Sequence, residues 1–505
     1  MRNIFLASLS GILLSFAWPA IGFFPFIFFA FVPLLILEEE GRIIFFHSFI
    51  AFLIFNILTT YWVWYATPSG SIFAFLVNSF LMSSAFLLFH KIKKATTNRL
   101  GYIAFVVCWL SFEYLHLNWD LSWPWLTLGN VFANATYAVQ WYEYTGILGG
   151  TLWVLLINVL IFRLYREKNL KTILLPFLLL LLPLIYSYSL IKKTKSKDQL
   201  NILIVQPNID PYTDKFSVGY EKQLVDFITL CRSKLNKEVD LLVGPETALQ
   251  EGIWENKVEA TFSIRALREL QKEFPNLNIL IGSSTYRMFN YGEKKTATAR
   301  QIRSENVYYD AYNSAIFIPD SGEVSIYHKT KLVPGAEKTP FPKLLDRLAK
   351  VMVDLGGVSG SLGSKNTIHQ FEINKNKIQP LICYESIYGD LRKGKSNLIT
   401  IITNDGWWKN TAGYKQHFSY ASLRAIEQRK TIVRSANTGI SGVINEKGEV
   451  VKQSKWDEVI CLSSTVNVNN ISTFYSIHGD YIGRISVFIA FMLLIVAFTK
   501  ERLKK

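Results

Sequence analysis

Three residues of the chain could act together in catalysis, and each follows a short apolar run. They are a carboxylate, Glu246, an amine, Lys329, and a thiol, Cys383. A carboxylate can take the proton of a thiol, and an ammonium can lower the thiol pKa and stabilise a developing oxyanion. Each residue alone also fits a structural role, since a single cysteine is usually a small buried hydrophobe. Together the three types suit nucleophilic catalysis by the thiol.

The runs that precede these residues belong to a region, 199–470, with the pattern of an α/β domain. Short β-branched segments alternate there with polar helical segments, which is typical of strands alternating with helices. Pro245 cannot donate to a strand ladder, so we expect the first run to end there and Glu246 to project from its end. The expected strands are 201–205, 239–243, 278–282, 314–318, 325–329, 379–382, 398–403, 431–434 and 442–444, and the expected helices are 217–235, 257–273 and 416–428.

The remainder of the chain is strongly apolar. Over all 505 residues, 50% are hydrophobic and 18% are charged, against about 25% charged in soluble domains. A membrane crossing needs about 20 apolar residues, and the chain has runs of roughly this kind at 4–18, 24–37, 43–65, 71–89, 101–117, 142–162, 172–191 and 482–499. We therefore predict an N-terminal membrane domain at 1–191 with seven spans and a C-terminal transmembrane helix at 482–499.

The distribution of charge favours a lipid bilayer over nucleic acid as the anionic partner. The net charge is +15, and basic residues gather in loops that would share one side of the membrane, as the positive-inside rule requires of cytoplasmic loops. These residues are Lys91, Lys93, Lys94, Arg99, Arg163, Arg166, Lys168, Lys171, Lys500, Arg502, Lys504 and Lys505. The rule places 192–481 on the outer side, where the cluster Lys192, Lys193, Lys195 and Lys197 could touch phospholipid headgroups. Glu113 and Glu143, in or near predicted spans, are expected to be hydrogen-bonded to neighbouring helices.

Three segments resemble the motifs of the nitrilase superfamily, in the same order. They are Gly244-Pro245-Glu246-Thr247-Ala248, the stretch from Tyr327 through Lys329 to Glu337, and Ile382-Cys383-Tyr384-Glu385. The resemblance implies an αββα sandwich with a Glu246–Lys329–Cys383 triad. Further segments are similar to that family at 403–408, 424–427 and 435–439.

Seven spans before such a domain and one after it resemble the membrane-embedded apolipoprotein N-acyltransferase family of bacterial inner membranes. The resemblance implies transfer of an acyl chain from a glycerophospholipid to the N-terminal amine of a diacylglyceryl-cysteine lipoprotein, through a thioacyl-enzyme on Cys383. The catalytic domain would lie on the periplasmic side. No cofactor or metal is expected. The alternatives are a membrane-tethered amidase or nitrilase acting on a small substrate, and a transporter or scaffold that carries an inert domain.

Further residues receive supporting roles from the same resemblance or from their position. Glu337 would orient Lys329 or aid proton transfer, and Tyr384 and Glu385 would shape the site beside the thiol. Trp407 and Trp408 are candidates for the entrance of the acyl chain. The apolar residues Leu345, Leu348, Val351, Met352, Val353 and Leu355 are candidates for a lid. His328 and His417 are rival bases, but His328 should face away from Lys329 because neighbours in a strand point to opposite faces.

Overall fold

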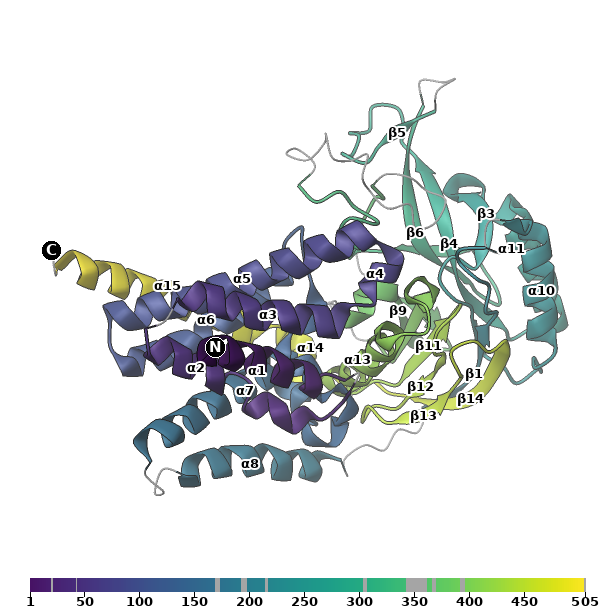
Figure 1. Ribbon diagram of the computed structural model, residues 1–505. Coiled ribbons are helices and arrows are strands. Elements are labelled where there is room, and N and C mark those ends of the chain that lie inside the picture. The colour runs from purple at the N-terminus through teal and green to yellow at the C-terminus, as the bar shows by residue number, and fades with distance from the viewer. Residues whose placement is uncertain are drawn as a thin grey trace. The chain divides into compact units, whose positions relative to one another are not determined.

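The computed structural model describes most of the chain as two compact units (Figure 1). The helical unit comprises Met1–Thr194, Lys415–Gln428 and Thr473–Lys505, and the sandwich unit comprises Lys195–Tyr414 and Arg429–Ser472. The described residues are 1–19, 21–41, 43–168, 173–191, 198–213, 217–302, 307–341, 361–365, 369–390 and 396–503. The predicted lid residues between 345 and 355, and the lysine cluster at 192–197, lie outside the described residues.

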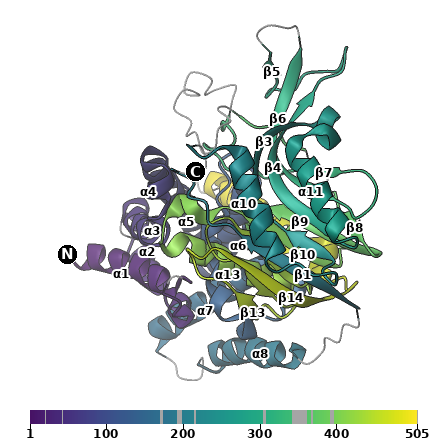
Figure 2. The same ribbon diagram turned by 90° about the vertical axis from the view of Figure 1, so that its right-hand side faces the viewer.

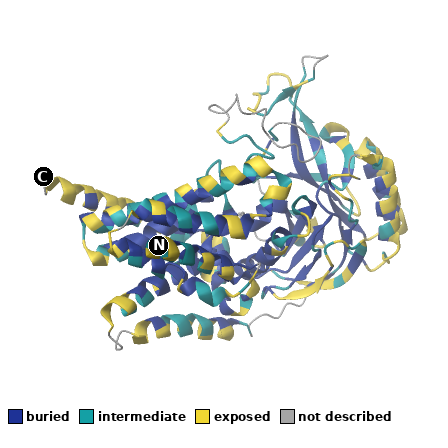
Figure 3. Ribbon diagram, viewed as in Figure 1, coloured by how far each residue is buried: buried dark blue, intermediate teal, exposed yellow. Residues whose placement is uncertain are grey.

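The helical unit contains helices at the positions of the apolar runs, together with α14 and most of α13. They are α1 (Arg2–Ala17), α2 (Val32–Glu39), α3 (Ile44–Thr60), α4 (Val63–Ala66), α5 (Pro68–Ala95), α6 (Asn98–His116), α7 (Tyr142–Glu167), α8 (Leu174–Leu190), α13 (Ala412–Gln428), α14 (Phe474–His478) and α15 (Tyr481–Leu503). Within the described residues, α5, α7 and α15 are long and apolar enough to cross a membrane by length and composition. Figure 3 shows exposed positions along α8 and α15, and many of their exposed side chains are large and apolar. The total of eight crossings stays a prediction.

The run at 24–37 does not form one helix. It contains a short 3₁₀ helix, η1 (Phe24–Phe28), followed by α2, and each begins with a proline in its first two positions, Pro25 and Pro33. Proline has no backbone N–H and fits best in the first turn of a helix, where that N–H would have no partner. The two prolines therefore start new helical segments instead of continuing one.

Buried and half-buried carboxylates tie the helices of this unit together. Glu38 at the end of α2 is paired with His90 and Lys93 of α5. Glu113 of α6 accepts hydrogen bonds from Trp109 Nε1 at 3.0 Å, from the Leu128 N–H at 2.8 Å and from Thr151 Oγ1 at 2.7 Å. The structural interpretation of Glu113 is thus confirmed, since its oxygens are satisfied by α6, α7 and the intervening segment.

The sandwich unit is built from two mixed sheets. The first has the strand order β14 (Ile460–Val468), β1 (Asp198–Gln206), β2 (Leu241–Val243), β4 (Asn278–Met288), β6 (Tyr308–Ile318) and β5 (Arg300–Gln301), with β3 (Leu249–Trp254) paired to β4 and β7 (Ser325–His328) paired to β6. The second has the order β13 (Val450–Gln453), β12 (Gly442–Ile444), β11 (Ile432–Ala436), β10 (Leu398–Thr403), β9 (Asn376–Ile382) and β8 (Phe371–Ile373). Every strand expected from the sequence is present, whereas β3, β5, β8, β13 and β14 were not expected.

The two sheets share a buried core, and helices cover the outer face of the first sheet (Figures 1 and 2). Ile202 and Ile204 of β1 pack in one cluster with Ile402 of β10. Leu203 and Val205, which alternate with them, pack in a second cluster with α10 (Tyr220–Arg232) and α11 (Phe262–Glu273). The period of two along β1 thus separates a sheet–sheet layer from a sheet–helix layer. The predicted combination of a helical region with a two-sheet α/β sandwich is confirmed.

Two predicted helices differ in detail from the structure. The expected helix 257–273 is a 3₁₀ helix, η6 (Glu255–Ala260), followed by α11, because Thr261 between them has extended backbone (φ −70°, ψ 149°). The expected helix 416–428 is present as α13, which connects the parallel strands β10 and β11. Most of α13 groups with the helical unit rather than with the sandwich unit.

A glycine in β4 leaves room for the segment that carries Glu246. Gly282 donates its N–H to Pro245 O at 3.0 Å. A methyl group on Gly282 would lie 2.5 Å from Thr247 N and 2.7 Å from both Glu246 Cα and Pro245 O. Because these are backbone atoms, a side chain at position 282 must displace the backbone of residues 245–247, which follow β2.

We expect Gly282→Ala to lower the free energy of unfolding of the sandwich unit by about 1–3 kcal/mol, the usual cost of overpacking a close-packed site. Thermal unfolding of the purified full-length protein measures the effect. The control is Gly219→Ala, because nothing lies within 4 Å of a methyl group at that position. Equal midpoints for the two variants would show that the 245–247 segment is not held against β4.

Candidate functional site

The three candidate residues stand at strand ends of the sandwich unit. Glu246 follows β2 and Lys329 follows β7 in the first sheet, whereas Cys383 follows β9 in the second. All three are buried, with 8%, 1% and 9% of their surfaces exposed. Residues scattered over 138 positions of the chain are thus brought into one buried region because the two sheets pack face to face.

Lys329 lies between two carboxylates. Its Nζ donates to Glu337 Oε1 at 2.8 Å and to Glu246 Oε1 at 3.3 Å. Burial alone would lower the pKa of Lys329, but the charges of Glu337 and Glu246 raise it above its usual range. The lysine is therefore an ammonium at neutral pH, and it can stabilise negative charge that develops nearby.

Asn313 of β6 binds the same two carboxylates as Lys329. Its Nδ2 donates to the same two oxygens, at 2.7 Å to Glu246 and 3.0 Å to Glu337, and its carbonyl accepts the backbone N–H of Lys329 at 2.8 Å. The backbone N–H groups of Asn404 and Val333 donate to the remaining carboxylate oxygens, at 3.1 Å to Glu246 Oε2 and 2.8 Å to Glu337 Oε2. Each carboxylate is thus held through both of its oxygens.

Cys383 sits at a sharp turn between β9 and a short 3₁₀ helix, η8 (Cys383–Ile387). Its φ of +49° lies in the left-handed region, which is uncommon for a residue with a side chain and costs on the order of 1 kcal/mol or more. Burial and the negative charge of Glu246 raise the pKa of the thiol, while Lys329 opposes that rise. The resting group is a protonated thiol within the field of a carboxylate that can accept its proton.

Glu385 is fully buried and forms hydrogen bonds with the two segments that carry Lys329 and Cys383. Its Oε1 accepts the Tyr327 hydroxyl at 2.9 Å and both the N–H and the hydroxyl of Thr330, and its Oε2 accepts the N–H of Ile382 at 2.8 Å. The strand β9 ends at Ile382, so Glu385 belongs to η8. Its carboxylate binds the segment that follows Lys329.

A second buried ion pair lies at the end of the strand next to Cys383. Ile402 of β10 is paired with Ile382 of β9, so the following residue, Thr403, lies beside the thiol. Its hydroxyl donates to Asp405 Oδ1 at 2.9 Å, and Arg434 of β11 donates to Asp405 Oδ2 at 2.7 Å. Thr403, Asp405 and Arg434 have no exposed surface, so this pair supports the loop from within.

The aromatic candidates occupy the rim of this region. Tyr384 is buried, with its ring centroid 5.3 Å from that of Tyr388. Trp407 and Trp408 are half-buried and close the 3₁₀ helix η9 (Asp405–Trp408), where Tyr212 donates its hydroxyl to Trp407 O at 2.7 Å. Trp407 lies three residues after Asn404, whose N–H donates to Glu246 Oε2. The assignment of Trp407 and Trp408 to an acyl entrance stays a prediction.

The two candidate histidines, His328 and His417, contact residues other than Glu246, Lys329 and Cys383. His328 Nε2 lies 2.6 Å from Glu255 Oε1, and its ring centroid lies 4.1 Å from that of Tyr312. His417 belongs to α13 in the helical unit, with its ring centroid 5.6 Å from that of Trp125. His328 and Lys329 thus have different partners, although the strand β7 ends at His328 and does not include the lysine.

Sequence reasoning did not assign roles to Asn313, Thr403 or the Asp405–Arg434 pair. Asn313 could have been found as a polar residue that directly precedes the apolar run 314–318. Two amide atoms near Glu246, Asn313 Oδ1 and Asn404 Nδ2, have no hydrogen-bond partner among the described residues.

Comparison with known proteins gave matches over both halves of the chain. The Carbon-nitrogen hydrolase profile matches residues 204–473, and the profile of the Apolipoprotein N-acyltransferase N-terminal domain matches residues 10–160. An apolipoprotein N-acyltransferase of Chlorobaculum tepidum is 29% identical over 99% of this chain and 97% of its own. One of Geobacter metallireducens is 25% identical over 99% and 96%. A nitrilase-superfamily protein of known structure from Saccharomyces cerevisiae covers 54% of this chain and 92% of its own, with 15% identity and a TM-score of 0.39.

The two charges beside Cys383 should move the thiol pKa in opposite directions. Because Glu246 raises this pKa and Lys329 lowers it, we expect Glu246→Gln to make alkylation of Cys383 faster at a given pH and Lys329→Gln to make it slower. In the unaltered protein the alkylation rate should keep rising above pH 8.5, roughly the ordinary thiol pKa.

The rate is measured with iodoacetamide between pH 6 and 10, by mass spectrometry of the peptide that contains Cys383. Cys108, buried in the helical unit, provides a second thiol whose rate the two substitutions should leave unchanged. A shift of the same sign in both variants would show that the two residues do not act on the thiol through their charges.

Proposed function

The chain belongs to the carbon–nitrogen hydrolase family, and we propose that it is an apolipoprotein N-acyltransferase. It would move an acyl chain from a membrane glycerophospholipid to the α-amine of a diacylglyceryl-cysteine lipoprotein. The observation that carries the proposal is the Lys329 ammonium shared by Glu246 and Glu337 beside a buried thiol. The match of the N-terminal profile to the same chain supports the choice of this activity over simple hydrolysis.

The first half-reaction would form a thioester on Cys383. Glu246 accepts the thiol proton while the sulfur attacks the carbonyl carbon of a fatty-acyl ester. The carbonyl oxygen becomes an oxyanion, which Lys329 and a backbone N–H next to Cys383 stabilise. Collapse of this intermediate breaks the ester C–O bond, and the proton held by Glu246 passes to the leaving lysophospholipid.

The second half-reaction would transfer the acyl group to nitrogen. The neutral α-amine of the lipoprotein attacks the thioester carbon, Glu246 takes a proton from that nitrogen, and the C–S bond breaks. The products are an amide and the regenerated thiol. A covalent intermediate divides one difficult transfer into two steps and predicts ping-pong kinetics.

Glu337 and Glu385 have positioning roles in this scheme. Glu337 holds the ammonium from the side opposite Glu246, and Glu385 holds the loops on which Lys329 and Cys383 stand. Tyr384 is proposed to shape the pocket beside the thiol. Trp407 and Trp408 are proposed to line the entrance of the acyl chain.

The chain is a membrane protein, and its substrates explain the need for a membrane. Withdrawing an acyl chain from the bilayer into water costs about 0.8 kcal/mol per CH₂, so a site that opens toward lipid avoids a large penalty. The proposed location is the bacterial inner membrane, with the sandwich unit on its outer side. The support is the asymmetry of lysine and arginine between the loops.

The acyl-enzyme can be sought directly. Purified protein is incubated with a phospholipid that carries a labelled acyl chain, and we expect label on the Cys383 peptide that neutral hydroxylamine releases. Adding a diacylated lipopeptide with a free α-amine should move the label to the lipopeptide. We expect Cys383→Ala to abolish the acyl-enzyme and to reduce transfer by at least about 10³-fold, while Cys108→Ala, which removes a buried thiol of the helical unit, should keep both.

Two results would overturn the proposal in different ways. Label that persists in Cys383→Ala would exclude this thiol as the nucleophile. Release of the label to water faster than to the lipopeptide would favour the alternative, a membrane-tethered amidase or nitrilase for small substrates.

A further inference from the structure

Two cysteines outside the catalytic site meet in the sandwich unit. Cys231 lies in the last turn of α10, and Cys461 is the second residue of β14. Their exposed fractions are 0% and 6%. The Sγ of Cys461 lies 3.5 Å from the carbonyl oxygen of Leu230, the residue before Cys231, and the two thiols are hydrogen-bonded to each other.

The fold holds this contact in place. α10 packs on the first sheet through Phe227 and Ile228, in the same apolar cluster that contains both cysteines. β14 is the edge strand of that sheet and pairs with β1, where Cys461 lies opposite Val205. Both sulfurs therefore lie in the layer between helix and sheet, on elements that are anchored independently.

The two thiols are chemically unequal. The hydrogen bond from Cys231 and the charge of Lys234 lower the pKa of Cys461. Burial raises the pKa of Cys231 well above its usual range. Thiolates attack disulfides and thiols do not, and Cys461 is also the more exposed of the two cysteines. Cys461 is therefore suited to attack first and Cys231 to respond second.

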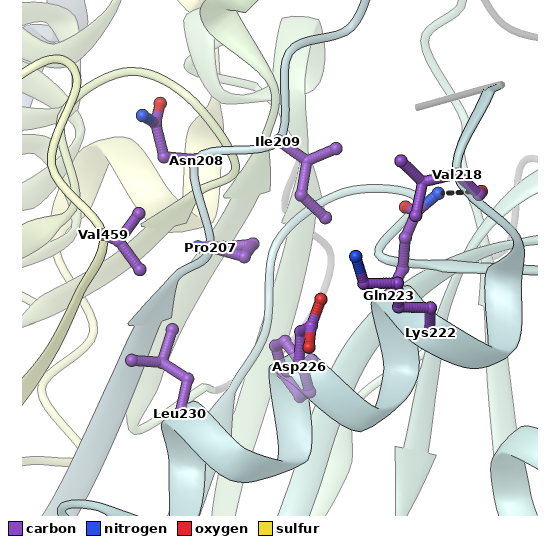
Figure 4. A pocket seen from close by; sticks show the side chains of 10 residues that line it. Pro207, Asn208, Ile209, Val218, Lys222, Gln223, Asp226, Leu230 and Val459 are labelled. Atoms are coloured by element: carbon purple, nitrogen blue, oxygen red, sulfur yellow. Dashed lines mark hydrogen bonds between the residues drawn. The ribbon is translucent and has the colours of Figure 1, made fainter. Parts of the chain in front are cut away.

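A cavity lies beside residues that are close in sequence to the two cysteines. It is lined by Leu230 and Val459, together with side chains of α10 and the segment after β1 (Figure 4). Leu230 precedes Cys231 by one residue and Val459 precedes Cys461 by two. Figure 4 shows Leu230 on the helix and Val459 on the opposite segment, both directed toward the cavity. A small disulfide that enters this cavity would contact Leu230 and Val459, which neighbour the two cysteines in sequence.

We propose that Cys231 and Cys461 are a disulfide-forming pair that is oxidised by exchange with an external disulfide. The Cys461 thiolate attacks one sulfur of the external disulfide, and a thiolate leaves. Cys231 then gives up its proton and attacks the Cys461 sulfur, which releases a second thiolate. Two protein thiols become one disulfide, the external disulfide becomes two thiols, and the two protons pass to the released thiolates.

The bond would join the end of α10 to the edge strand β14 and so secure the helix layer to the sheet. A disulfide that closes a long loop stabilises the fold mainly by restricting the unfolded chain. Disulfides persist outside the cytoplasm, and the inference rests on the proposed location of the sandwich unit on that side. It does not rest on the proposed chemistry, since Cys231 and Cys461 lie in the helix–sheet cluster and Cys383 lies in the sheet–sheet cluster.

The test uses full-length Cys383→Ala protein, so that the catalytic thiol does not interfere. The protein is incubated with oxidised glutathione, denatured, alkylated with N-ethylmaleimide and digested without reductant. We expect a cross-linked peptide pair that contains Cys231 and Cys461, with Cys108 alkylated. The oxidised protein should melt about 5 °C or more above the reduced protein.

Single substitutions test the order of attack. In a Cys231→Ser background, Cys461 should accumulate as a mixed disulfide with glutathione, whereas in a Cys461→Ser background Cys231 should remain alkylatable after denaturation. Cys108→Ser, the matched control, should leave the cross-link intact. Alkylation of both Cys231 and Cys461 after oxidation, or glutathione on Cys231 rather than on Cys461, would overturn the proposal.

Discussion

A buried ammonium shared between two carboxylates is the interaction on which the site depends. Lys329 has 1% of its surface exposed and contacts both Glu246 and Glu337. Removing one partner from a buried ion pair typically costs about 3–5 kcal/mol, because the remaining charge is left uncompensated. The strand ends that carry these groups are therefore constrained together, and Asn313 adds a neutral donor to the same two oxygens. The site is rigid because its charges satisfy one another, before any substrate arrives.

The Cys383 thiol, in contrast, is carried by the second sheet. Cys383 stands where β9 turns sharply into η8, and its neighbour Glu385 reaches back to the segment that follows Lys329. The Asp405–Arg434 pair supports the adjacent end of β10. The buried carboxylates of Glu385 and Asp405 thus hold in place the segments that carry Lys329 and Cys383. The helical unit supplies the apolar helices that the proposed lipid substrates require.

Much of this could be predicted from the sequence, because the strands that carry the site are continuous buried runs. The runs 379–382 and 398–403 have no alternation to obscure them, and reactive residues at their ends stand out. β13 was missed because all four of its residues are exposed, and β14 because polar residues interrupt it. Asn313 and Arg434 were not assigned roles, because their partners are distant in sequence. Asn313 binds Glu246 and Arg434 binds Asp405, and these contacts form only once the strands have paired. The grouping of α13 with the helical unit likewise depends on tertiary packing, which periodicity does not report.

The most direct test of the central claim is a double-mutant cycle on the rate of thioacyl-enzyme formation, with Glu246→Gln, Lys329→Met and the combined variant. Residues that act as a unit lose most of their effect when either one is removed. The account predicts that the combined variant is little slower than the slower single variant. Losses that multiply, so that the free-energy costs of the two single changes add in the combined variant, would contradict the claim that the carboxylate and the ammonium work as one device on Cys383.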